Sequence, residues 1–270
     1  MVAAGVLAFR EGLEAALILG IVLGVLCRVG RDDQLRLVWI GAGLAALVSL
    51  AGGLGLLALG LAFEVRAEEI FEGTAMLLAA SVLTWMIFWM GRQSRTVQGE
   101  LERDARLAAL TGGGWALFSL AFVAVLREGI ELALFLTAAA FTASAGATLI
   151  GGFVGLGAAA VAGWLLFATT RNLNVRGFFR LTSVLLILFA AGLVAHGVHE
   201  FNEVGWIPPI IEHVWDLNPV LDEASGAGQL LKALLGYNGN PSLTEVVAYV
   251  GYWAVILAAL WRVKGQTKPL

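Results

Sequence analysis

Two short charged motifs interrupt apolar segments of this chain that are long enough to span a membrane. The first, Arg-Glu-Gly-Leu-Glu, begins at Arg10, and the second, Arg-Glu-Gly-Ile-Glu, begins at Arg127. Ionisable side chains within a membrane-spanning helix are costly and are therefore usually functional. Because the motif occurs twice, the sequence predicts one site to which two segments contribute similar residues. Its predicted members are Glu11, Glu14, Glu128 and Glu131, with Arg10, Gly12, Arg127 and Gly129 as their motif partners.

The chemistry of these motifs is that of carboxylates held beside guanidinium groups. On a helix that turns about 100° per residue, the arginine and both glutamates of one motif fall on one face. Two such faces offer four carboxylates and two guanidiniums, a net charge of -2 when all are ionised. Carboxylate oxygens suit hard, multivalent cations, and each glycine leaves room for a neighbouring helix or an ion. A simpler alternative is that each arginine only pairs with the glutamate four residues later and locks helices together.

A second group of polar side chains is expected near the outer ends of two other apolar segments and in the loop that follows them. Imidazole and carboxylate together suit transition metals, so these residues are candidates for metal entry. Their His-x-x-His-Glu order differs from the His-Glu-x-x-His metalloprotease signature. Capping of helix ends and solvated charge would explain them equally well. The group comprises Glu68, Glu69, Glu72, His196, His199, Glu200, Glu203, Asp222 and Glu223.

The composition indicates a polytopic, all-α membrane protein. Of the 270 residues, 59% are hydrophobic and 14% are charged, whereas soluble domains carry roughly 25% charged residues. The single cysteine, Cys27, excludes an intramolecular disulfide and a cysteine-based metal site. The first apolar segment lacks a basic leader, so we expect a retained helix rather than a cleaved signal peptide. Seven segments are long enough to cross a hydrocarbon core of about 30 Å, namely 2–27, 37–62, 71–91, 113–141, 147–170, 181–200 and 243–261.

Basic residues are concentrated in alternate connections between these segments. Residues 28–36, 92–106, 171–180 and 262–268 hold 13 of the 17 basic residues, whereas the connections on the other side are acidic. By the positive-inside rule the basic side is cytoplasmic. We therefore expect the N-terminus outside and the C-terminus in the cytoplasm, as an odd number of spans requires.

The positions of the two motifs, in the first and fourth segments, suggest an internal repeat of three helices. Residues 1–91 would form the first repeat and residues 113–200 the second, inverted in the membrane because three is an odd number. The second and fifth segments are both rich in glycine. An outer loop at 201–242 and a seventh helix at 243–261 complete a single membrane domain over 1–270.

The paired motifs resemble those of the iron permease family, the oxidase-dependent iron transporters. This family includes fungal high-affinity iron permeases and bacterial EfeU-type ferrous iron permeases. The resemblance covers essentially the whole chain and extends to Leu83-Thr84-Trp85-Met86 in the third segment. It implies that the four motif glutamates bind iron during translocation. Fungal members carry an acidic extracellular motif whose nearest counterpart here, Asp222-Glu223-Ala224-Ser225, has a different order.

The resemblance implies an inward transporter of iron in a plasma membrane or bacterial inner membrane, and not an enzyme. Iron would be the transported substrate, and no permanently bound cofactor is expected. The implied partner is an extracytoplasmic oxidase or peroxidase, or an iron-binding protein; contact with membrane lipid is expected, and contact with nucleic acid is not. Three alternatives stay open. They are transport of another metal such as lead or manganese, a membrane-embedded metalloenzyme using His196, His199 and Glu200, and a non-transporting scaffold.

Overall fold

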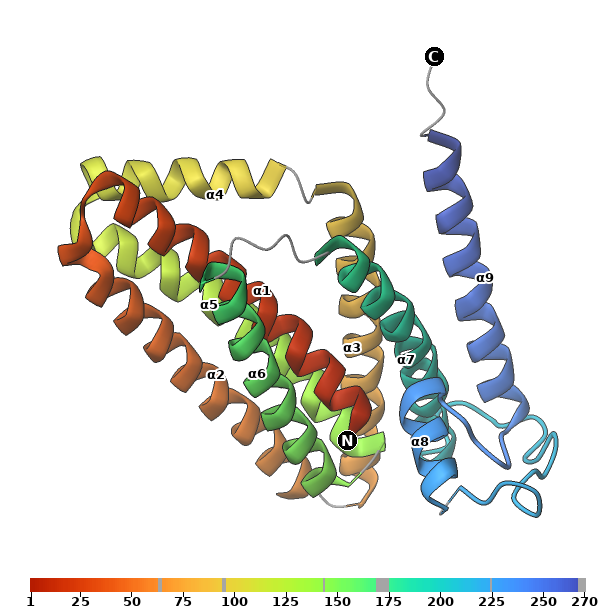
Figure 1. The fold of residues 1–270 in the computed structure, drawn as a ribbon. Helices are drawn as coiled ribbons and strands as arrows, with labels where there is room; N and C mark the ends of the chain where they lie inside the picture. Colours follow the sequence, from red (N-terminus) through yellow and green to blue (C-terminus); the bar gives the residue numbers. More distant parts are fainter. Residues whose placement is uncertain (63–64, 94–95, 143, 169–174, 224, 267–270) are drawn as a thin grey trace.

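The chain folds into a bundle of helices (Figure 1). The computed structural model describes residues 1–62, 65–93, 96–142, 144–168, 175–223 and 225–266, and these ranges contain no strand. Shorter elements in them are η1 (Asp32–Gln34), α4 (Thr96–Leu107), η2 (Ala108–Gly112) and α8 (Gly226–Leu235). The long helices are α1 (Val2–Val29), α2 (Leu35–Ala62), α3 (Val65–Gln93), α5 (Gly113–Thr142), α6 (Ala145–Ala168), α7 (Val175–Glu203) and α9 (Leu243–Gln266).

Most of the long helices have the character of membrane spans. In the described part of the chain, six of them are long and apolar enough to cross a membrane by length and composition. The exception, α5, has 30 residues, but three charged side chains interrupt its apolar sequence near the middle. These features confirm the prediction of an all-α protein with several apolar spans.

The helices extend beyond the apolar segments from which they were predicted. The third begins at Val65 rather than at residue 71, so Glu68 and Glu69 lie inside α3 and not before it. Helices α4 and α8 were not predicted, because both lie between apolar segments in stretches assigned to connections. Three basic residues used to orient the chain, Arg95, Arg171 and Lys268, lie outside the described residues.

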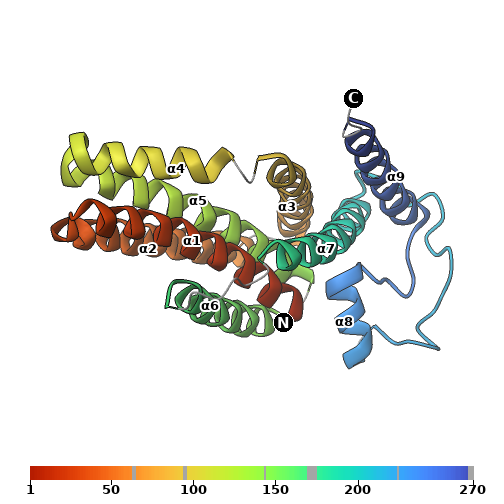
Figure 2. The same cartoon turned by 45° about the horizontal axis from the view of Figure 1, so that its top comes forward.

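The long helices form two groups. The first contains α1, α2, α5 and α6, and the second contains α3, α7 and α9. Helix α1 packs mainly against α6, and α2 packs mainly against α5. Beside these four helices, α3 packs against α7, and α9 flanks α7 (Figure 2). Helices α1 and α5 also contact each other and run antiparallel, and the N-terminus and the end of α9 lie at opposite ends of the bundle (Figure 1).

Small residues at every fourth position allow α6 to approach α1 closely. A side chain at Gly155 would overlap the carbonyl of Gly5, and a Cβ there would lie 2.9 Å from the Cβ of Ala8. The same face of α6 presents Gly151 and Gly163 to α1. Small residues spaced by four bring helix backbones into contact in membranes, where van der Waals packing drives association. The α1–α6 pair therefore depends on the absence of side chains along one face.

Helix α2 also packs closely against α5 through glycines. A Cβ at Gly41 would lie 2.6 Å from the carbonyl oxygen of Phe118, and one at Gly53 would lie 3.2 Å from the Cβ of Ala133. Close helix pairing thus explains part of the glycine richness of the second and fifth apolar segments, namely the glycines that face a neighbouring helix.

Two clusters of buried apolar residues lie on either side of the charged motifs. The first cluster includes Leu7, Met76 and Phe135, and the second includes Val22 and Leu117. Along both α1 and α5 the motif falls between a residue of one cluster and a residue of the other. The bundle therefore separates the charged side chains from both ends of α1 and α5 by close-packed apolar layers.

We expect substitution of Gly155 by leucine to disrupt the α1–α6 pair. Overpacking a close contact costs about 1–3 kcal/mol, so the detergent-solubilised variant should unfold at a lower temperature than the parent protein in a fluorescence-monitored melt. Gly157→Leu is the matched control, because no atom lies within 4 Å of a Cβ built at Gly157. Equal melting temperatures for the two variants would contradict the proposed packing role.

Candidate metal site

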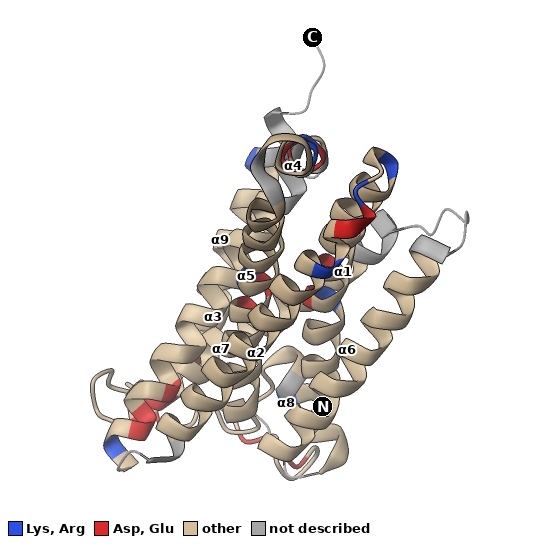
Figure 3. Cartoon of the chain, turned by 90° about the vertical axis from the view of Figure 1, so that its left-hand side faces the viewer, with Lys and Arg blue, Asp and Glu red and all other residues tan. Residues whose placement is uncertain are grey.

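The two charged motifs meet in the middle of the bundle. Arg10 to Glu14 lie on α1 and Arg127 to Glu131 lie on α5, the two antiparallel helices that contact each other. Charged residues gather between these helices well away from both ends of the bundle (Figure 3). The sequence-based expectation that the two motifs face each other is therefore met.

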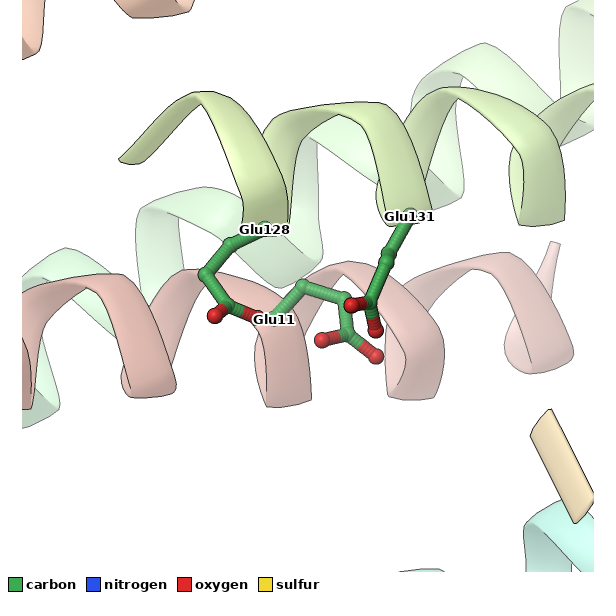
Figure 4. A group of neighbouring side chains, drawn as sticks. All are labelled: Glu11, Glu128 and Glu131. Carbon is green, nitrogen blue, oxygen red and sulfur yellow. The ribbon is translucent and has the colours of Figure 1, made fainter. Parts of the chain in front are cut away.

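Three carboxylates converge at this point. Glu11 of α1 and Glu128 and Glu131 of α5 each place one oxygen within 4.8 Å of the others, and their side chains point toward one another (Figure 4). Glu11 is 1% exposed and Glu128 is 4% exposed. Among the described residues, no other group of three acidic, histidine or cysteine side chains meets this criterion. We call this cluster the carboxylate triad.

Arg10 compensates the α1 side of the site. Its Nη1 lies 2.8 Å from Glu11 Oε1, and its Nη2 lies 3.1 Å from Glu14 Oε1. Nη1 also donates a hydrogen bond of 3.3 Å to the sulfur of Met86 on α3. Arg10 is 1% exposed, so its charge is held in a low-dielectric environment by these contacts. Glu14, also a predicted ligand, is paired with Arg10 and is not a member of the triad.

Arg127 compensates the α5 side in a more open setting. Its Nε lies 3.1 Å from Glu131 Oε1 and 3.9 Å from Glu128 Oε1. Its guanidinium carbon lies 5.0 Å from the centre of the Trp89 ring on α3, a cation–π distance. The side chain is 44% exposed, in contrast to the buried Arg10. The two motifs have the same sequence pattern but unequal surroundings.

One oxygen of each triad carboxylate has no partner in the described part of the chain. Oε1 of Glu11, Glu128 and Glu131 faces an arginine, whereas the buried Oε2 atoms have no hydrogen-bond partner among the described residues. Leaving a buried charged acceptor without a partner costs at least about 1–3 kcal/mol. Carboxylate oxygens from three residues that lie within 4.8 Å of one another match the oxygen donors that a hard cation requires.

The motif glycines provide room for neighbouring helices. A Cβ at Gly12 would lie 2.9 Å from the Cβ of Ala159 on α6. A side chain at Gly129 would overlap Ser49 on α2. The sequence predicted that these glycines leave room for a neighbouring helix or for an ion. The contacts show a neighbouring helix at both positions.

A cavity of about 260 Å³ adjoins the triad. Glu11 and Glu128 lie on its wall, and the remainder is almost entirely apolar and comes from α1, α2, α5 and α6. Ser49 is one of the few other polar residues of the wall. Polar ligand atoms are thus confined to one part of the cavity.

The secondary candidates are distributed between an acidic helix pair and a hydrogen-bonded loop. Glu72 of α3 and Glu200 of α7 lie close enough to repel each other, with Glu68, Glu69 and Glu203 nearby. His196 Nδ1 lies 3.0 Å from the carbonyl of Gly192. His199 Nδ1 lies 3.1 Å from Glu245 Oε1. The two histidines are therefore engaged with other protein groups and do not form a cluster with Glu200.

Asp222 and Glu223, the two candidates in the outer loop, take part in its internal hydrogen bonding. Glu223 accepts a hydrogen bond of 2.6 Å from the backbone of Gly239 and lies 3.3 Å from Lys232 Nζ. The carbonyl of Asp222 accepts a 2.6 Å hydrogen bond from the hydroxyl of Ser225, which caps α8. These contacts order the loop.

Several residues around these sites were not predicted to have a role in them. Glu245 is buried at the first turn of α9, where it accepts hydrogen bonds from the backbone of Ser242 and, at 2.7 Å, from Asn238. Ser242 and Glu245 form a capping box, and the Ser-x-x-Glu spacing that signals it was present in the sequence. Met86 was indicated only as part of the Leu83-Thr84-Trp85-Met86 motif, and Trp89 was not among the predicted site residues.

The fold and the site define a multi-pass membrane protein that buries a carboxylate cluster between two helices. The family model described as iron permease FTR1 matches residues 1–264, and the chain belongs to this family. It is 38% identical over 253 residues to ferrous iron permease EfeU of Escherichia coli O6:H1 (strain CFT073), covering 93% of this chain and 91% of that protein. It is 36% identical over 247 residues to ferrous iron permease EfeU of Yersinia pestis, covering 90% of this chain and 87% of that protein. No solved structure matches the chain.

These comparisons confirm the family resemblance inferred from the paired motifs. Together with the apolar helices, they also confirm the predicted multi-pass location in a plasma membrane or bacterial inner membrane. The relatives are named as permeases and not as enzymes.

Replacing Arg10 by methionine should destabilise the protein far more than replacing Arg127. Removing one partner of a buried ion pair typically costs about 3–5 kcal/mol, and Arg10→Met leaves Glu11 and Glu14 without their shared cation. Arg127→Met is the matched variant, because that side chain is 44% exposed. A detergent-phase thermal melt should rank the melting temperatures as parent, then Arg127→Met, then Arg10→Met; the reverse order of the variants would contradict the assignment.

Proposed function

We propose that this chain carries iron inward across the membrane through the carboxylate triad. The observation that supports the proposal most directly is the set of Oε2 atoms on Glu11, Glu128 and Glu131 that have no partner among the described residues, buried between two helices near the middle of their lengths. Family membership and the names of the relatives, which are ferrous iron permeases, support iron as the cargo. Iron would be the transported substrate, and we propose no permanently bound cofactor.

The arginines explain how such a site is maintained between transport events. In the absence of a cation, Arg10 and Arg127 compensate part of the carboxylate charge through their ion pairs with the motif glutamates. With all four motif glutamates ionised the net charge is -2, which attracts a cation. An arriving ion would bind the free oxygens while the arginines retain the others, so binding does not require every ion pair to break. Glu14, held by Arg10, would act as a reserve ligand.

The proposed topology has seven spans, an inverted three-helix repeat and an external N-terminus. An inverted repeat would relate α1 to α5, α2 to α6 and α3 to α7. Exchanging these helices converts the α1–α6 pair into the α5–α2 pair and leaves the α3–α7 pair unchanged, and these are the three main pairs of the bundle. The direction of insertion rests on the positive-inside rule. In this arrangement α5 counts as a span, because Glu128 and Glu131 are largely buried and Arg127 pairs with both of them.

The acidic ends of α3 and α7 are the proposed entry region for the ion. Glu68, Glu69, Glu72, Glu200 and Glu203 lie at the end of the bundle that this topology places outside, together with Asp222 and Glu223 of the loop. We further propose an extracytoplasmic oxidase, peroxidase or iron-binding protein as the partner that delivers iron there. His196 and His199 are assigned to positioning of α7 and α9 rather than to catalysis.

Glu11→Gln and Glu128→Gln should each reduce uptake of radiolabelled iron in cells to the background level. Each substitution keeps the side-chain volume but removes a charge from the triad, so the site loses cation affinity. Glu100→Gln on the exposed face of α4 is the matched control and should transport like the parent. The three variants are compared at equal amounts of membrane-inserted protein, and parental uptake in both triad variants would exclude this route.

Uptake of radiolabelled iron in the presence of competing unlabelled metals tests which metal the protein transports. An excess of unlabelled iron should suppress uptake of the label, and manganese, zinc and lead should suppress it less at equal concentration. Stronger suppression by one of these three metals would reassign the substrate while leaving the carboxylate site as the route.

A further inference from the structure

Ser49 on α2 stands out because its hydroxyl lacks the partner that would be expected within its own helix. The Oγ atom is buried and has no hydrogen-bond partner among the described residues. Elsewhere in the bundle, Ser81, Thr84 and Thr137 each donate to the carbonyl four residues earlier, at 2.7–2.8 Å. A hydroxyl group in an apolar helix usually makes this hydrogen bond to the backbone of its own helix. Ser49 does not make that bond, so its hydroxyl remains available to another partner.

Ser49 lies beside the second charged motif and on the wall of the cavity that adjoins the carboxylate triad. A side chain at Gly129 would overlap both Oγ and Cβ of Ser49, so the serine lies directly against the motif of α5, next to Glu128. Ser49 also lines the cavity whose wall includes Glu11 and Glu128. Ser49, Glu11 and Glu128 therefore line the same cavity.

The charge of the site favours a neutral additional donor. With all four glutamates ionised, the motif side chains carry a net charge of -2, enough to match a divalent cation, so a further carboxylate would overcompensate the ion. Hard and borderline cations commonly take more oxygen ligands than three carboxylate atoms supply. A serine hydroxyl offers two lone pairs without adding charge.

The corresponding contact on the other side of the site lacks this group. Gly12 of the α1 motif faces Ala159 of α6, whose side chain is a methyl group. If Ser49 served only to keep α2 close to α5, a small apolar residue would serve equally well, as Ala159 does for α1 and α6. The hydroxyl thus needs an explanation beyond packing.

We propose that Ser49 is a neutral oxygen ligand for the transported cation, supplied by α2 beside the carboxylate triad. The proposal rests on the proposed transport function and extends the site from two helices to three. It assigns α2 a part in binding as well as in packing. Because α2 would hold one ligand of the ion through Ser49, motion of that helix would change the coordination of the ion.

Replacing Ser49 by alanine tests the hydroxyl while keeping the small size of the residue. We expect the KM for uptake of radiolabelled ferrous iron to rise about tenfold, the effect of losing one polar contact to a charged ligand. Thermal stability should be unchanged. Ser81→Ala is the matched control, because its hydroxyl bonds to its own helix, and it should leave the KM at the parental value. A parental KM in Ser49→Ala overturns the proposal.

A cysteine at the same position gives an independent measurement. In a Cys27→Ser background the variant Ser49→Cys has one thiol, since Cys27 is the chain's single cysteine. Ferrous iron under anaerobic conditions should slow modification of this thiol by a small methanethiosulfonate reagent at least about fivefold if iron binds next to it. A rate that iron does not change, or a thiol that does not react, also counts against the proposal.

These variants separate failure of the Ser49 assignment from failure of the proposed function. If the parent protein takes up no iron, or if Glu128→Gln transports normally, then the carboxylate route itself is wrong. If the parent transports iron and Glu128→Gln does not, while Ser49→Ala matches the parent, then only the assignment of Ser49 is wrong.

Discussion

A carboxylate buried between membrane-spanning helices must be compensated by groups that the protein itself supplies, because lipid cannot solvate it. This constraint accounts for the centre of the structure. Arg10 is almost completely enclosed, yet each of its terminal nitrogens contacts a glutamate of its own helix. Arg127 contacts both glutamates of the second motif. The compensation is incomplete, since three carboxylate oxygens have no partner among the residues that the structure describes, and that remainder is what makes the cluster suitable for a cation.

Bringing two charged helix faces together places demands on the rest of the bundle. The backbones of α1 and α6, and of α2 and α5, approach so closely that several contacts exclude even a methyl group. Glycine is unfavourable in an isolated helix, but here it permits the van der Waals contact on which association in lipid depends. Apolar clusters on both sides of the motifs then confine the polar atoms to a narrow zone.

The two halves of the site are chemically matched but not equivalent. Arg10 is buried against Met86, whereas Arg127 lies over Trp89 with nearly half of its side chain exposed. Gly12 faces an alanine and Gly129 faces a serine. A transport site receives its ion from one side of the membrane and then releases it to the other side. Unequal surroundings for two similar motifs are compatible with that requirement, because the two sides can then respond differently to the same ion.

The sequence by itself determined the class of the protein, its family and the charged centre. Apolar segments of membrane length are set by composition, and a duplicated Arg-Glu-Gly-x-Glu motif is specific enough to be recognised without coordinates. Only the tertiary structure decided which side chains come together at that centre. It placed Glu11, Glu128 and Glu131 together, and it brought Ser49 and Trp89 to the site from other helices. A helical repeat gives the face on which a side chain lies, but the partner of that face depends on which helices pack together. That pairing arises from contacts between residues far apart in the sequence, and no local pattern encodes it.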